Sequence, residues 1–124
     1  LHGGGVSRRS FIHMDDVSDA TLKIMLHGKN GNTYHISTNE IVSIRQLVET
    51  LCKKLDVHFD DHAEIVGERL GKDAAYQLDS NKIRSELNWQ DNISLDKGLD
   101  QCIDWVKSNF NTLKNEPFNY IHKK

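Results

Sequence analysis

Short runs of β-favouring residues alternate with longer segments of helical periodicity along the sequence, and this alternation limits the folds that the chain can adopt. Four such runs occur, at residues 11–14, 33–37, 63–66 and 75–78. None of them is a long apolar strand of the kind that fills a buried parallel sheet. The pattern therefore predicts a mixed α/β fold that is rich in helix, with short strands between the helices.

Four helices are expected from apolar residues at helical spacing. They cover residues 17–27, 44–55, about 81–87 and about 95–110. Asp15 and Asp16 are expected to cap the first helix, which ends at Gly28. The second helix begins with a capping box formed by Ser43 and Gln46. Ser80 and Ser94 are the expected caps of the last two helices. The residues expected on buried helix faces include Val17, Ala20, Ile24, Met25, Cys52 and Cys102.

Composition excludes several classes of protein. The chain has 124 residues and a formal net charge of −2, and its basic and acidic residues are evenly mixed. A basic face that follows a phosphate backbone is therefore not expected. No apolar run reaches membrane-spanning length, and the first residues lack a signal-peptide pattern. We therefore expect a cytoplasmic protein that binds neither nucleic acid nor a membrane, with Cys52 and Cys102 as reduced core residues.

Two glycine-containing stretches resemble phosphate-binding motifs but lack parts of them. Gly3-Gly4-Gly5 is expected to be flexible, and a polar run follows it, whereas a dinucleotide-binding turn would follow a strand and open a helix. Residues 67–72 end in Gly-Lys like a P-loop. Their glycines are too closely spaced, however, and Asp73 stands where Ser or Thr would bind magnesium.

Two further groupings also fall short of a site. Cys52, His58 and His62 lack a fourth ligand at suitable spacing, so a zinc site is not expected. Tyr120 and Lys124 have the spacing of a proton-transfer pair on a helix, but they lie in a terminal segment expected to be loosely ordered. Coincidence explains this spacing better than catalysis does.

Polar side chains flank three of the predicted strands. Arg9 precedes the run at 11–14, Asn39 follows 33–37, and Arg69 follows 63–66. In α/β folds ligands bind at strand ends, because the scaffold presents loops there. Two guanidinium groups and an amide suit a diphosphate, since Arg makes bidentate hydrogen bonds to phosphate. A solvated surface position is the alternative for each arginine.

Four segments carry one resemblance when they are taken together. Residues 1–16 are similar to a segment written Gly-x-Gly, three residues, Arg-Asp-(Trp/Phe/Tyr)-(Leu/Ile)-(Tyr/His)-Val-x-Asp, and residues 33–36 to a Tyr-Asn-(Ile/Val)-Gly strand. Residues 68–79 are similar to an Arg-Pro-Gly-His-Asp-x-Arg-Tyr-x-(Leu/Ile)-Asp signature, with Leu70 and Lys72 in place of its proline and histidine. Residues 80–89 resemble a Lys-(Ala/Ile)-x-x-Glu-Leu-Gly-Trp helix. These are the motifs of the extended short-chain dehydrogenase/reductase family, in particular its NAD-dependent nucleotide-sugar 4,6-dehydratases.

The resemblance implies a role for each matching residue. Arg9 and Arg69 would bind the diphosphate of a nucleotide-diphosphate sugar, and Asn39 would support a phosphate contact. Asp73 and Tyr76 would stabilise the loop. Residues 1–110 would form the C-terminal, nucleotide-sugar-binding portion of an extended Rossmann-fold enzyme, and residues 111–124 a loosely ordered tail. The catalytic Tyr and Lys and the NAD-binding turn would lie upstream of Leu1.

The implied reaction oxidises the sugar at C4 by hydride transfer to NAD, eliminates water across C5 and C6, and returns hydride at C6. We expect the 124-residue chain alone to be inactive, and the parent enzyme to be a homodimeric lyase. A nucleotide-sugar epimerase or decarboxylase of the same family is the alternative enzyme. A non-catalytic ligand-binding or interaction module is the alternative from another class.

Overall fold

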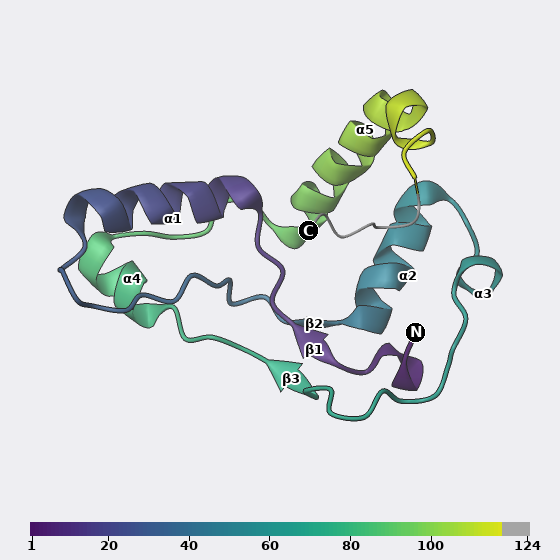
Figure 1. Cartoon of the computed structure of the whole chain (residues 1–124), viewed down its shortest axis with the longest axis horizontal. Helices are drawn as coiled ribbons and strands as arrows, with labels where there is room; N and C mark the ends of the chain where they lie inside the picture. The colour runs from purple at the N-terminus through teal and green to yellow at the C-terminus, as the bar shows by residue number, and fades with distance from the viewer. Residues whose placement is uncertain (118–124) are drawn as a thin grey trace.

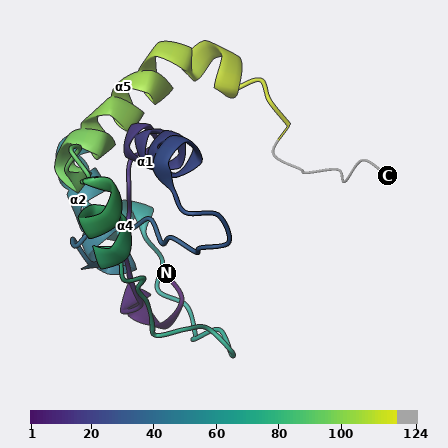
Figure 2. The ribbon, with the colours of Figure 1, turned by 90° about the vertical axis from the view of Figure 1, so that its left-hand side faces the viewer.

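The computed structural model describes residues 1–117 and confirms the mixed α/β class, with about half of these residues in helices and only a small sheet. The elements are, in chain order, η1 (Gly3–Gly5), β1 (Arg8–Arg9), α1 (Met14–His27), β2 (Val42–Ser43), α2 (Ile44–Leu55), α3 (Phe59–His62), β3 (Ala75–Tyr76), α4 (Asn81–Leu87) and α5 (Leu95–Leu113). In Figure 1, α1 and α4 lie together at one end and α2 and α3 at the other, with the strands between them. Figure 2 shows α5 along the outer edge of the molecule.

The core lies where α1 packs on α4. Ala20, Ile83 and Trp89 are buried there, and partly buried side chains surround them. Full burial of one large apolar side chain contributes about 1.5–3 kcal/mol, so Ile83 and Trp89 dominate this small core. The guanidinium of Arg84 lies 5.0 Å from the centre of the Trp89 ring. It also donates to Asp91 Oδ1 at 2.6 Å, which ties the end of α4 to the chain that leads into α5.

Two predicted helix starts are confirmed in atomic detail. Ser43 Oγ accepts from the Gln46 amide at 3.0 Å, and Gln46 Oε1 accepts from the Ser43 amide at 2.8 Å. This reciprocal pair satisfies two amides that the first turn of α2 cannot bond internally. Ser94 Oγ accepts from the Lys97 amide at 3.3 Å at the start of α5.

The cap predicted for the first helix is wrong, whereas Ser80 is the N-cap residue of α4 as predicted. His13 caps α1, because its Nδ1 accepts from the Asp15 amide at 3.2 Å, and the helix therefore begins at Met14. The Asp16 carboxylate is buried instead, and it accepts from the main-chain amides of Asn92 and Ile93. At α4 the Ser80 side chain makes no capping bond.

A small three-stranded sheet joins distant parts of the chain, in the order β2-β1-β3. β1 pairs antiparallel with β2 and parallel with β3, so that Arg9 lies opposite Val42 on one side and Tyr76 on the other. The strand predicted at 75–78 is shortened to Ala75–Tyr76. The Gly3–Gly5 stretch, expected to be flexible, forms the short 3-10 turn η1.

The strands predicted at 11–14, 33–37 and 63–66 are absent from the described residues. In the last of them only Val66 is paired, through an isolated parallel bridge to His2. Met14 joins α1, whereas Ile12, Tyr34 and Ile36 pack their side chains on the core. Their backbones have no partner strand, and a strand exists only when its amides and carbonyls are paired with another.

Three further predictions need correction. Cys52 is buried, but Cys102 is exposed and lines an open cavity between α5 and α2. Met25 is 72% exposed, since α1 turns Ala20 and Ile24 toward α4 instead. α5 continues to Leu113 rather than ending near residue 110. Residues 118–124, with Tyr120 and Lys124, lie outside the described part, so the loosely ordered tail stays a prediction.

Neither a membrane span nor a metal cluster is found in the part of the chain that the structure describes. Within residues 1–117 no helix is both long and apolar enough to cross a bilayer. The same residues contain no group of three or more His, Cys, Asp or Glu placed to hold a metal ion.

Candidate functional site

β1 and β3 place Arg9 beside Tyr76, shortly after the loop that carries Arg69. Arg9 and Tyr76 are partners in the parallel pairing, so their side chains leave the same face of the sheet. Arg9 Nη2 donates to the main-chain oxygen of Asp73 at 3.0 Å, and Nη1 donates to the oxygen of Arg8 at 2.7 Å. Asp73 thus supports the site through its carbonyl oxygen, whereas its carboxylate forms no ion pair with Arg9 within residues 1–117.

The segment that carries Arg69, here called the Arg69 loop (residues 67–74), is fixed at both ends by the first nine residues. At its start, His2 forms the parallel bridge to Val66, and the Gly3 amide donates to the Val66 oxygen at 3.0 Å. At its end, the Arg8 amide donates to the Ala74 oxygen at 2.9 Å. Both ends of the Arg69 loop are therefore held in place by hydrogen bonds to the first nine residues.

Glu68 and Lys72 brace the inside of the Arg69 loop. Lys72 Nζ lies 2.7 Å from Glu68 Oε1 and donates to the main-chain oxygen of His2 at 3.3 Å. Glu68 Oε1 also accepts from the Arg69 amide at 3.0 Å. The hydrogen bond from Lys72 is the main cause that lowers the pKa of Glu68 below its usual value, so this carboxylate stays charged at neutral pH.

Gly3 leaves room for Glu68. A Cβ at Gly3 would clash with Glu68 Oε2, and Gly3 has a φ of +55°, where side chains other than hydrogen are disfavoured. A carboxylate this close to the backbone repels a phosphate group. The Glu68 carboxylate therefore disfavours a phosphate group at Gly3.

Asn39 lines a polar cavity of about 370 Å³ together with the segment that follows β3. Gln77, Leu78, Asp79, Ser80 and Asn81 form the rest of its wall. Because residues 77–81 directly follow Tyr76, this cavity continues from the end of the strand that pairs with Arg9. Three amides, one carboxylate and one hydroxyl line the wall, so it offers hydrogen bonds in both directions.

The five predicted site residues are thus partly brought together. Arg9, Asp73 and Tyr76 meet along β1 and β3, and Asn39 meets the segment that leaves β3. Arg69 is exposed on its loop, and its guanidinium bonds none of the other four within residues 1–117. In the same part of the chain, no carboxylate forms an ion pair with the guanidinium of Arg9 or Arg69, in contrast to Arg45 and Arg84.

The bracing pair Glu68–Lys72 and its contact with Gly3 were not predicted. The available signal was the opposite charge of two residues four positions apart, a spacing that favours contact on a helix. In this chain Glu68 and Lys72 have that spacing, but they pair across a turn that contains Gly71 with a φ of +76°.

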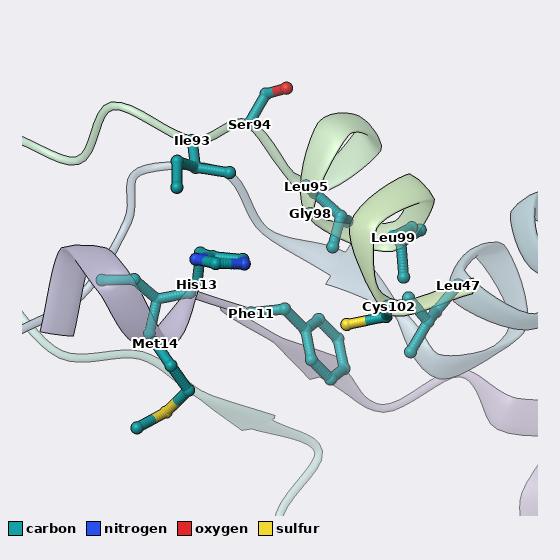
Figure 3. A pocket seen from close by; sticks show the side chains of 11 residues that line it. Phe11, His13, Met14, Leu47, Ile93, Ser94, Leu95, Gly98, Leu99 and Cys102 are labelled. Carbon is teal, nitrogen blue, oxygen red and sulfur yellow. The ribbon is translucent and has the colours of Figure 1, made fainter. Parts of the chain in front are cut away.

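A second cavity, of about 250 Å³, lies between α5, α2 and residues 11–14 (Figure 3). Its wall consists mainly of apolar side chains, among them Phe11, Leu47 and Leu99. His13 also faces it, but Nδ1 of that ring already caps α1. None of the five predicted site residues lines this cavity, and an apolar wall does not suit an anion.

Known proteins resemble this chain in both sequence and structure. The family model described as GDP-mannose 4,6 dehydratase matches residues 1–102. The mouse dTDP-D-glucose 4,6-dehydratase is 30% identical over 128 residues, which cover 95% of this chain and 36% of the mouse protein. The dTDP-glucose 4,6-dehydratase from Streptomyces niveus is 30% identical over 109 residues, which cover 88% of this chain and 32% of that protein.

Solved structures also resemble this chain. DesIV, a dTDP-glucose 4,6-dehydratase from Streptomyces venezuelae crystallised with NAD and TYD bound, superposes with a TM-score of 0.85 at 28% identity over 90% of this chain and 34% of that chain. The UDP-glucose 4-epimerase from Thermotoga maritima has a TM-score of 0.81 at 25% identity, over 89% of this chain and 35% of that chain. The chain thus spans about a third of the length of these relatives. The match over residues 1–102 confirms the resemblance read from the motifs: this chain belongs to the GDP-mannose 4,6 dehydratase family.

Proposed function

We propose that this chain is the nucleotide-sugar-binding part of a longer NAD-dependent nucleotide-sugar 4,6-dehydratase. The observation that carries the proposal is Arg9, whose guanidinium is oriented by two carbonyl oxygens and has no carboxylate partner in the described residues. A guanidinium fixed in this way keeps its charge available for an anion. The membership of the family and the dehydratases among the relatives support the reaction class.

In this proposal Arg9 and Arg69 hold the diphosphate, and Asn39 donates to it from the rim of the polar cavity. Tyr76 lies beside Arg9 and limits the positions that the guanidinium adopts, while the Asp73 carbonyl fixes its orientation. The Glu68–Lys72 pair keeps the Arg69 loop in shape, and it neutralises Lys72 so that the lysine does not compete for the phosphate.

NAD supplies reversible hydride transfer when it is bound, and we propose that the remainder of the parent enzyme binds it. The crowded Gly3 supports this assignment, since this glycine of the Gly3–Gly5 turn faces the Glu68 carboxylate. The proposal also includes a homodimeric, cytoplasmic parent without nucleic-acid or membrane partners, in line with the net charge of −2.

Incubation of the full-length parent with dTDP-glucose and with UDP-glucose tests the proposal. We expect a 4-keto-6-deoxy product, detected by mass spectrometry as the loss of one water. A 4-epimer of unchanged mass would contradict dehydration and indicate the epimerase. Loss of carbon dioxide in a parallel incubation with UDP-glucuronic acid, without dehydration of either nucleotide-glucose, would indicate the decarboxylase. The 124-residue chain alone should give no turnover.

A further inference from the structure

An apolar groove runs between α2 and α5. Its first part is the cavity of about 250 Å³ beside residues 11–14, and its second part, here called the distal groove, is a cavity of about 260 Å³. Cys102 lines both cavities, so they are neighbours along α5. The rest of the wall of the distal groove consists of Leu51, Leu55, Ile103, Val106 and Lys107.

Within residues 1–117 the distal groove is left partly uncovered. Leu55 is 46% exposed and Val106 is 44% exposed. Phe110, four positions after Val106 on the same face of α5, is 59% exposed. Full burial of an apolar side chain of this size contributes about 1.5–3 kcal/mol, so a segment that covers these residues would stabilise the protein.

Acidic side chains form a row beside the groove. Asp96, Asp100 and Asp104 are four positions apart on α5, so they lie one above the other. Lys54 Nζ of α2 lies 2.7 Å from an oxygen of Asp96 and 2.7 Å from an oxygen of Asp100. Among the described residues Asp104 forms no ion pair, not even with Lys107 three positions later. The row therefore ends in a carboxylate that is available to a cation.

The residues that follow α5 carry side chains that match the groove. The helix ends at Leu113, and Pro117 prevents its continuation, because proline lacks an amide and disfavours helical backbone in the residue before it. Apolar and basic residues then follow, namely Phe118, Tyr120, Ile121, His122, Lys123 and Lys124.

The length and spacing of this segment also match. Residues 118–124 lie outside the described part, but seven residues in an extended conformation span about 23 Å. Val106 and Asp104 lie only about 10 and 14 Å before Leu113 along the axis of α5. Phe118 and Tyr120 are two positions apart, about 7 Å in an extended chain, and Phe110 and Val106 are about 6 Å apart along the helix axis.

We propose that residues 118–124 run back along α5 in an extended conformation and cover the distal groove. In this arrangement Phe118 packs on Phe110, Tyr120 packs on Val106, and the basic residues 122–124 lie beside Asp104. The occupant is this segment of the same chain. A second copy of the chain and another part of the parent enzyme are the rival occupants, and the test below separates them.

A disulfide trap in the full-length parent tests the arrangement. Residues 118, 120 and 122 share one side of an extended segment, so residue 122 falls over Cys102, whose thiol is free and exposed. His122→Cys should therefore form an intramolecular disulfide with Cys102, identified by peptide mass spectrometry. The control carries Ser108→Cys, Cys102→Ser and His122→Cys. Ser108 is exposed, lines neither cavity and lies nearer to the end of α5.

We expect the bond to Cys102 to form at least about 10-fold faster than the bond to position 108, because docking raises the local concentration of the two thiols. Equal rates would overturn the proposal. The absence of the Cys102 bond would also overturn it and would indicate that another part of the parent fills the groove. A covalent dimer whose yield grows with protein concentration would overturn it in favour of a second copy.

The thermal stability of the parent gives an independent readout. Tyr120→Ser should lower its melting temperature, whereas Asn119→Ser, on the other side of an extended segment, should leave it unchanged. In a Val106→Ser background the effect of Tyr120→Ser should shrink, since the two side chains then no longer contact each other. Equal effects of Tyr120→Ser in both backgrounds would contradict the contact. Neither readout uses catalysis, so both are independent of the proposed dehydratase function.

Discussion

Arg9 donates a hydrogen bond from Nη2 to the main-chain oxygen of Asp73 at 3.0 Å, and this bond joins β1 to the end of the loop that carries Arg69. The two arginines proposed to bind diphosphate are therefore mechanically linked, although they lie 60 positions apart in the sequence. Replacement of Arg9 is therefore expected to disturb the end of the Arg69 loop, and a change at that end is expected to disturb the orientation of Arg9.

Replacement of Arg9 should weaken nucleotide binding by the full-length parent. We expect Arg9→Ala to lower the affinity for dTDP or UDP about 10- to 100-fold, because a charge-assisted hydrogen bond contributes roughly 1.5–3 kcal/mol. Isothermal titration calorimetry measures the change. Arg8→Ala is the matched control, since Arg8 is exposed on the same strand and should leave affinity unaltered. Equal losses in both variants would point to general damage to β1.

The contact between Gly3 and Glu68 should be visible in paired alanine variants. Gly3→Ala places a Cβ against the Glu68 carboxylate, whereas Gly4→Ala adds a Cβ with nothing within 4 Å, at a similarly positive φ of +70°. Both variants carry the backbone penalty of about 1 kcal/mol for a left-handed residue. We therefore expect Gly3→Ala to be the less stable of the two in urea denaturation. Glu68→Ala should abolish the difference, and a difference that persists in that background would exclude the contact as its cause.

The Arg84–Asp91 pair should make stability depend on pH. Desolvation raises the pKa of Asp91, but the hydrogen bonds from Arg84 and Thr38 outweigh it, and the pKa lies below its usual value. A carboxylate with a lowered folded pKa contributes stability above its unfolded pKa of about 3.9, and this contribution is lost as the pH falls through the folded pKa. We expect Asp91→Asn to cost about 1 kcal/mol at pH 7, since the pair is only partly shielded from water.

The measurement is a series of urea unfolding curves between pH 7 and pH 2.5. The gap between the wild type and Asp91→Asn should close below about pH 4. Asp19→Asn is a suitable control, because its partner Lys23 lies on the same helix at 3.6 Å with both side chains more exposed. A gap that stays constant down to pH 2.5 would mean that the charge of Asp91 is not its cause.

The capping box at α2 predicts a helix-specific loss. Ser43→Ala removes the acceptor of the Gln46 amide and should destabilise the chain by about 1 kcal/mol. Ser18→Ala, on the exposed face of α1, should be neutral or slightly stabilising because alanine is the better helix former. Chemical denaturation of the two variants measures both effects, and a neutral Ser43→Ala would show that the box is dispensable.

Local signals predicted the helices well and the strands poorly. The start of α2 depends on Ser43 and Gln46, three residues apart, so the sequence contains all the information for it. Residues 33–37 have equally clear strand residues, but a strand needs a partner, and none lies within residues 1–117. The start of α1 was misjudged because a histidine ring replaces the usual carboxylate or hydroxyl cap.

For the candidate site, too, local sequence signals predicted some features and missed others. Arg9, Asn39 and Arg69 were selected from their positions at predicted strand ends, yet all three of those strands, at 11–14, 33–37 and 63–66, are absent from the described residues. The motif resemblance therefore contributed more than the periodicity did. The role of the Asp73 carbonyl could not be predicted, because a main-chain acceptor is independent of the side chain, and its placement depends on the register of β1 with β3.

The anchoring of the Arg69 loop at Val66 and Ala74 has a consequence for divergence within the family. The first nine residues fix both ends of the Arg69 loop. A residue added or lost near the Leu70–Gly71 turn therefore changes only the length of the loop between these ends, at a small cost in loop entropy. A residue added between His2 and Arg8 would instead break one of the two attachments. We therefore expect insertions and deletions among homologues to accumulate at the turn, while the spacing from His2 to Arg9 stays constant.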